Sequence, residues 1–194
     1  MPVSKICVYC ASSNKCDEMF LKSAETLGSI LAKNGKTVVY GGGGSGLMGR
    51  LADGVLKSGG SIVGIIPNFM QELEWAHTKL TELRLVSTMH ERKLMMMQES
   101  DGIVALPGGS GTFEELLEAI TWKRLGLITS PIVIANLNNY YAPMIEMLEK
   151  SVEEKFMRPE HLQMWSVVNS IEEILPALEN AAPWSEDARS FAAV

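Results

Sequence analysis

Residues 106–115 read LPGGSGTFEE and join two segments of opposite character. Residues 101–106 are short, apolar and β-prone, whereas residues 116–125 carry apolar side chains at helical spacing. The pattern predicts a strand, a glycine-rich turn and a helix. Backbone N–H groups in such a turn approach an anion closely, and the helix N-terminus adds partial positive charge. We therefore predict a phosphate cradle with a carboxylate on the first helical turn.

That carboxylate, Glu115, has a structural and a functional interpretation. Thr112 and Glu115 fit a capping box, in which each side chain satisfies a backbone amide at the helix start. In the functional interpretation, the helix dipole favours the ionised form of Glu115. An ionised carboxylate beside a bound phosphosugar can stabilise an oxocarbenium ion or activate water. Glu114 points about 100° away around the helix, so only one of the two glutamates is expected to face the reaction centre.

A second glycine-rich junction lies earlier in the chain. Residues 36–40 predict a strand, residues 41–49 read GGGGSGLMG, and residues 47–57 predict a helix. Tight turns with positive φ would explain some of these glycines, but four in a row favour phosphate binding, with Gly43 and Gly44 as candidate contacts. Neither junction contains the Gly-Lys-Ser/Thr of a P-loop or a convincing dinucleotide fingerprint.

The rest of the chain alternates strand-like and helix-like segments. Further strands are predicted at 5–9, 61–66, 82–86, 103–106, 131–135 and 165–168, and further helices at 17–33, 88–99, 141–150 and 170–178. This alternation predicts an α/β fold: a Rossmann-like, doubly wound parallel sheet in a three-layer single domain. We place this nucleotide-binding domain at residues 1–180, with a C-terminal tail at 181–194 that is expected to fray.

Ligands of such a sheet bind at the carboxyl ends of the strands. Ser12 is a candidate there, because it follows the first predicted strand in the small polar loop ASSN at 11–14. Residues 68–80 are irregular and predict a loop or short helix near the same site.

Composition excludes several classes of function. The chain has 17 Lys and Arg against 23 Asp and Glu, a net charge of −6, which argues against nucleic-acid binding. No apolar run reaches the ~20 residues of a membrane span, and no signal peptide is evident, so we expect a cytoplasmic location without a membrane partner. Cys7, Cys10 and Cys16 are an odd number of cysteines, and they favour reduced thiols over disulfides or a metal site.

Arg92 and Lys93 would read alone as a solvated face of the helix predicted at 88–99. Residues 89–93, MHERK, together with residues 107–115, PGGSGTFEE, nevertheless resemble the signature of the LOG ("lonely guy") family. The glycines at 42–49 are also similar to that family, and the likeness runs from about residue 4 to residue 178. LOG proteins are cytokinin riboside 5′-monophosphate phosphoribohydrolases, although many carry an older label of lysine decarboxylase.

The resemblance implies a Rossmann-like fold, a homodimer, and hydrolysis of the N-glycosidic bond of adenosine-type 5′-monophosphates without a cofactor. It implies that Arg92 and Glu115 are catalytic. The nucleotide contacts that it implies are Glu74, Lys93, Gly109, Ser110, Gly111, Thr112, Phe113, Glu114 and Thr121. Ser110 departs from the bulky aromatic residue that is frequent in the family, which leaves the preferred base open between AMP and a prenylated nucleotide.

Two other functions are weighed against the hydrolase. In a non-catalytic, nucleotide-sensing module, Glu115 would be only a helix cap and Arg92 only a surface ion. Amino-acid decarboxylation would need a lysine in a recognisable cofactor-anchoring context, and the sequence offers none.

Overall fold

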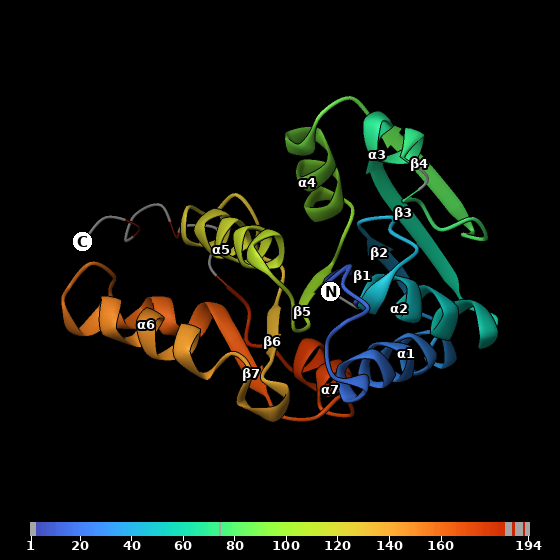
Figure 1. The fold of residues 1–194 in the computed structure, drawn as a ribbon. Coiled ribbons are helices and arrows are strands. Elements are labelled where there is room, and N and C mark those ends of the chain that lie inside the picture. The colour runs from blue at the N-terminus through green and yellow to red at the C-terminus, as the bar shows by residue number, and fades with distance from the viewer. Residues whose placement is uncertain (1–2, 74, 185–187, 189–191, 193–194) are drawn as a thin grey trace.

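The computed structural model describes residues 3–73, 75–184, 188 and 192 (Figure 1). Seven strands form one sheet in which every neighbouring pair is parallel, in the order β4-β3-β2-β1-β5-β6-β7. The strands are β1 (Lys5–Tyr9), β2 (Thr37–Tyr40), β3 (Ser61–Pro67), β4 (Glu82–Val86), β5 (Gly102–Ala105), β6 (Ile132–Ala135) and β7 (Trp165–Val168). Each agrees with a strand that the sequence predicts to within three residues.

Helices cover both faces of the sheet and make the fold three-layered (Figure 1). They are α1 (Glu18–Lys33), α2 (Gly46–Lys57), α3 (Asn68–Glu72), α4 (Met89–Gln98), α5 (Ser110–Arg124), α6 (Ala142–Glu153) and α7 (Ile174–Glu179), with short 3₁₀ helices at Leu137–Asn139 and Pro159–Met164. The doubly wound α/β prediction is therefore confirmed, and the irregular segment at 68–80 does contain a short helix.

Alternation along the buried strands creates two hydrophobic cores. In β1, Ile6 and Val8 pack with α1, α2 and α7, whereas Cys7 and Tyr9 pack with α4, α5 and α6. Both sets are almost fully excluded from solvent. A strand that is buried on both faces reads as a continuous apolar run, which is why these short segments were identifiable in the sequence.

The direction of chain winding reverses at β1. The chain proceeds from β1 outward through β2, β3 and β4, then returns to the other side of β1 with β5 and continues through β6 to β7. In open α/β sheets, ligands bind beyond the carboxyl ends of the strands at this switch point. Here the loops that follow β1 and β5 are residues 10–17 and 106–109.

The start of α5 differs from the prediction. The helix begins at Ser110 after Gly109, and no side chain caps its N-terminus, so the proposed capping box of Thr112 and Glu115 is wrong. Glu115 is the sixth residue of the helix, and the first turn contains no acidic residue. Thr112 packs instead against Gly108. A Cβ on Gly108 would lie 2.1 Å from the Thr112 Oγ1.

The C-terminal tail also differs from the expected frayed segment in its described residues. The Trp184 indole N–H donates to the Lys123 carbonyl at 2.8 Å, and the Arg124 Nε donates to the Ala192 carbonyl at 3.1 Å. Ala188 and Ala192 are both buried. These contacts place Trp184 and Ala192 against the C-terminal end of α5. No helix in the described part of the chain has the length and apolarity needed to cross a bilayer.

Candidate functional site

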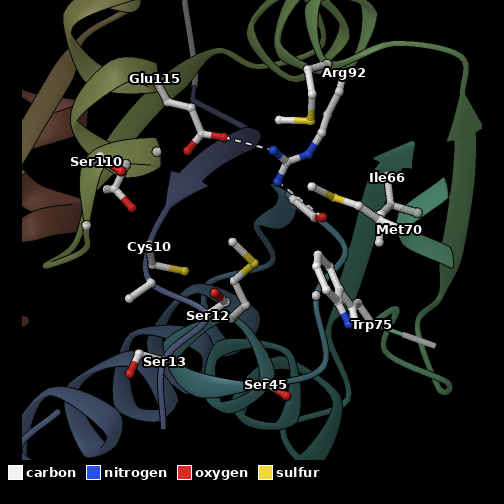
Figure 2. Close-up of a pocket in the computed structure, with 18 residues that line it drawn as sticks. Cys10, Ser12, Ser13, Ser45, Ile66, Met70, Trp75, Arg92, Ser110 and Glu115 are labelled. Carbon is white, nitrogen blue, oxygen red and sulfur yellow. Dashed lines mark hydrogen bonds and ion pairs between the residues drawn. The ribbon is translucent and has the colours of Figure 1, made fainter. Parts of the chain in front are cut away.

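A cavity of about 630 Å³ lies at the switch point, beyond the carboxyl ends of β1 and β5. Figure 2 shows Ser110 and Glu115 of α5 on one side of it, Trp75, Met70 and Ile66 on the other, and Arg92 reaching in from α4. Its lining is Cys10, Ala11, Ser12, Ser13, Gly41, Gly43, Ser45, Met48, Ile66, Met70, Trp75, Met89, Arg92, Gly109, Ser110, Gly111, Thr112 and Glu115.

The N-terminus of α5 presents amides to this cavity. The first helical hydrogen bond runs from the Phe113 N–H to the Gly109 carbonyl at 3.0 Å, so the N–H groups of residues 110–112 precede any intrahelical acceptor. Two hydroxyls hold the preceding turn: Tyr140 donates to the Gly108 carbonyl, and Tyr141 donates to the Leu106 carbonyl at 2.8 Å. With those carbonyls engaged, the turn offers its donors to an anion.

The side chain of Arg92 is buried, and three acceptors hold its guanidinium in place. Its Nε donates to the Ile65 carbonyl at 3.1 Å, its Nη2 to the Gly41 carbonyl at 3.3 Å, and its Nη1 to Glu115 Oε1 at 3.2 Å. The approach of the guanidinium depends on glycine, because a Cβ on Gly41 would lie 1.8 Å from Nη2. One of the four consecutive glycines therefore makes room for the arginine.

Glu115 is buried, and its protonation is set by two opposing effects. Burial raises the pKa of the carboxyl to about 7, and the Arg92 guanidinium, which favours the ionised form, opposes that rise. The expectation that a helix dipole would favour ionisation is therefore wrong for this residue, because it lies beyond the first turn and out of water. A carboxyl with a pKa near neutrality is suited to exchanging protons during a reaction.

The structure also shows which other kinds of chemistry the residues at the cavity do not support. Burial raises the pKa of the Cys10 thiol far above its usual range, so this sulfur is a neutral, apolar wall and no nucleophile. None of the described lining residues is a lysine, so a Schiff base has no amine to form on and decarboxylation gains no support. Cys7, Cys10 and Cys16 are free thiols, and the described residues contain no cluster of three or more His, Cys, Asp or Glu fit to hold a metal.

The structure gathers most of the predicted site residues in the cavity. Those that line it are Arg92, Glu115, Ser12, Gly43, Gly109, Ser110, Gly111 and Thr112. Those that do not line it in the single chain are Gly44, Lys93, Phe113, Glu114 and Thr121. Glu74 falls outside the described residues.

The predicted residues outside the cavity have other partners. Lys93 is buried and pairs with Glu114 and, at 2.9 Å, with Glu118, which ties α4 to α5. The Thr121 hydroxyl donates to the Leu117 carbonyl at 2.8 Å. The Gly44 amide donates to the Trp75 carbonyl at 2.9 Å, so it is already occupied. Of the two adjacent glutamates, Glu115 faces the cavity and Glu114 faces away, as their helical spacing predicts.

Sequence reasoning missed the apolar wall of the cavity. Ile66, Met70, Trp75 and Met89 come from three separate elements and the loop after α3, and none belongs to a glycine junction. Only the position of residues 68–80, after a strand's carboxyl end, pointed to this side of the site. Met48 reaches the cavity from the first turn of α2.

Comparison with known proteins identifies the family of this chain. Residues 48–178 match the family described as "Possible lysine decarboxylase". Cytokinin riboside 5′-monophosphate phosphoribohydrolase LOG3 of Arabidopsis thaliana is 38% identical over 94% of this chain and 85% of its own length, and LOG1 of the same plant is 37% identical over 96% and 87%. In fold, the molybdenum cofactor carrier protein of Chlamydomonas reinhardtii superposes with a TM-score of 0.70 at 20% identity, over 93% of this chain and 98% of that one. The chain therefore belongs to the LOG family, whose Arabidopsis members are named cytokinin riboside 5′-monophosphate phosphoribohydrolases.

Proposed function

We propose that this protein hydrolyses the N-glycosidic bond of adenosine-type nucleoside 5′-monophosphates and releases the free base and ribose 5-phosphate. The observation that carries the proposal is the buried pair of Arg92 and Glu115, 3.2 Å apart, on the wall of a cavity that also receives the N-terminus of α5. The activity for which the Arabidopsis relatives are named supports the same reaction.

The 5′-phosphate binds at the N-terminus of α5 in this proposal. The free amides of residues 110–112 and the positive end of the helix dipole favour a dianion there. Ser12, Ser13 and Ser45 line the neighbouring side of the cavity with hydroxyl groups. Gly43 and Gly109 also line it. A Cβ on Gly109 would stand in open space, which leaves room for the ligand to approach the backbone, whereas one on Gly43 would lie 2.8 Å from Met48 Sδ.

The ribose then lies beneath Arg92 and Glu115. As the bond between the anomeric carbon and the base breaks, its electron pair leaves with the base and positive charge develops on the ribose. The Glu115 carboxylate stabilises this charge and accepts a proton from the attacking water, whose oxygen bonds to the anomeric carbon. Arg92 keeps Glu115 oriented. Glu115 then passes the proton that it took from the water to the departing base, which returns the carboxyl to its ionised form, and ribose 5-phosphate is the second product.

The test is direct release of base by the purified protein. Adenosine 5′-monophosphate and N6-isopentenyladenosine 5′-monophosphate are incubated side by side, and the base and ribose 5-phosphate are quantified. Equimolar appearance of both products from either nucleotide supports the proposal. Binding of both nucleotides without any release of base would favour the nucleotide-sensing alternative.

The rate should depend on pH through Glu115. Since its pKa is raised to about 7 and the carboxylate is the working form, kcat/KM should fall about tenfold per pH unit below 7 and level off above it. The measurement is a pH profile between about 5 and 9 at constant ionic strength. The substrate phosphate has its own pKa near 6, so a profile that bends only there would contradict the assignment.

We further propose a cytoplasmic homodimer. Leu94 on α4 and Leu117 on α5 are large apolar side chains about two-fifths exposed, on the two helices that carry Arg92 and Glu115. A second copy would cover such residues. The free thiols of Cys7, Cys10 and Cys16 fit a reducing compartment. Light scattering of the purified protein tests the dimer, and charged residues at positions 94 and 117 should shift it to monomer.

A further inference from the structure

We propose that Trp75 is the residue on which the base of the substrate stacks, and that a short strap of residues 75–77 holds it there. This inference rests on the proposed function, because it assigns the base-binding side of the same cavity. Trp75 lines the cavity, yet 55% of its surface is exposed. A large aromatic side chain in that position offers a face to a ligand at little cost in conformational entropy.

The strap is paired with the glycine run that follows β2. The Trp75 carbonyl accepts from the Gly44 N–H at 2.9 Å, and the His77 N–H donates to the Gly42 carbonyl at 2.9 Å. Ala76 and Gly43 form an antiparallel bridge between those two bonds. The Trp75 N–H also donates to the Met70 carbonyl at 3.2 Å, so the backbone of Trp75 is held from both sides.

This pairing explains glycines that a phosphate site alone does not. A Cβ on Gly44 would lie 3.3 Å from the His77 Cα and 3.4 Å from the Ala76 carbonyl oxygen, so the strap packs closely against this glycine and would have to shift slightly to admit a side chain. Gly42 has a φ of 77°, in the left-handed region that favours glycine. The run GGGG thus serves Arg92 through Gly41 and the strap through Gly42 and Gly44.

A side chain anchors the far end of the strap. His77 Nε2 lies 3.5 Å from Asp53 Oδ1 on α2, and its Nδ1 accepts from the Lys79 N–H at 3.2 Å. Accepting at Nδ1 places the ring proton on Nε2, where it faces the Asp53 carboxylate. The strap is therefore tied to α2 as well as to the glycine run.

The position of Trp75 in the cavity fits the base of the nucleotide. Figure 2 shows Trp75 across the cavity from Ser110, which stands at the phosphate-binding helix terminus, and Arg92 reaching from α4 toward Glu115 on the Ser110 side. The neighbours of Trp75 on its wall, Ile66 and Met70, are apolar. A purine that meets this wall is held by stacking and by contacts with polarisable sulfur, independently of its N6 substituent.

The first test separates binding of the base from binding of the sugar phosphate. In Trp75→Ala, KM for adenosine 5′-monophosphate should rise about tenfold, within the range measured for loss of a base–aromatic stack, and KM for the N6-isopentenyl nucleotide should rise equally. The inhibition constant of ribose 5-phosphate, which has no base, should stay unchanged. Trp75→Phe keeps an aromatic face and should restore most of the affinity, and Trp122→Phe, away from the cavity, should behave as wild type.

An unchanged KM in Trp75→Ala would overturn the inference. An equal rise in the inhibition constant of ribose 5-phosphate would overturn it too, because it would mean that Trp75 affects the whole site. The second test needs no turnover. Adenosine 5′-monophosphate should quench a fluorescence component that Trp75→Phe lacks and Trp122→Phe retains, whereas ribose 5-phosphate should not. Quenching without hydrolysis would defeat the proposed function alone, and hydrolysis with identical quenching in Trp75→Phe would defeat the role of Trp75 alone.

Discussion

Replacing Glu115 with Gln should lower kcat by about 10²–10⁴-fold, the usual contribution of a side chain that takes part in proton transfer and charge stabilisation. The amide keeps the size of the carboxyl and an oxygen that accepts from Arg92 Nη1. It supplies neither negative charge for an oxocarbenium ion nor a base for water. In the proposed complex the ground state binds through the phosphate and the base, so KM should change little. Single-turnover release of adenine, followed by chromatography, measures the loss.

The matched control for that variant is Glu118→Gln. Glu118 lies on the same helix, outside the cavity, where it pairs with Lys93. It should retain kcat within a few-fold, and its melting temperature should report any general effect of removing a carboxylate from α5. Wild-type turnover in Glu115→Gln would mean that the buried pair is structural, and would remove the mechanism proposed for this cavity.

Much of the fold could be predicted because its strands are buried on both faces. Segments such as 5–9 and 131–135 are too short and too apolar to be amphipathic helices, and glycine or proline marks several strand ends. Because the predicted strands alternate with predicted helices, the strands should pair in parallel through right-handed crossovers. Few strand orders satisfy both conditions. The position of the ligand cavity at the carboxyl ends of β1 and β5 followed from that topology.

The details at α5 could not be predicted from local pattern alone. Thr112 and Glu115 have the spacing of a capping box, but the helix starts two residues before Thr112, because Thr112 packs on Gly108 and two tyrosines from beyond β6 hold the turn. The protonation of Glu115 likewise depends on burial by distant parts of the chain. A carboxyl that reads as ionised in isolation is raised to a pKa of about 7 inside the fold.

The apolar wall of the cavity could not be predicted from the sequence for a related reason. Trp75 is separated from the glycine run by more than 30 residues, and only the strap brings them together. The second glycine junction was predicted to bind phosphate, yet its amides do not all face the cavity. The Gly44 N–H donates to the Trp75 carbonyl of the strap, and the absence of a side chain at Gly41 makes space for the Arg92 guanidinium. A glycine run signals close approach but does not say what approaches.

Replacing Arg92 with Ala should lower kcat/KM by about 10²–10³-fold, comparable with loss of one fixed charge or donor at a reacting centre. The same change leaves Glu115 buried without its cation, so the pKa of that carboxyl should climb above 7. The acidic limb of the pH profile should therefore move to higher pH, and part of the lost activity should return in alkaline buffer. A uniform loss at every pH would contradict the coupling between the two residues.

Gly41→Ala should displace the Arg92 side chain without changing residue 92 itself. The new Cβ would lie 1.8 Å from Arg92 Nη2, and because the carbonyls of Gly41 and Ile65 belong to buried backbone, the guanidinium must yield. Activity should fall to nearly the level of Arg92→Ala. The double variant Gly41→Ala/Arg92→Ala should be no worse than Arg92→Ala alone, because the clash has lost its partner and effects on one contact are not additive. Losses that instead multiply in the double variant would mean that Gly41 serves the substrate directly, and that the arginine does not depend on the space it leaves.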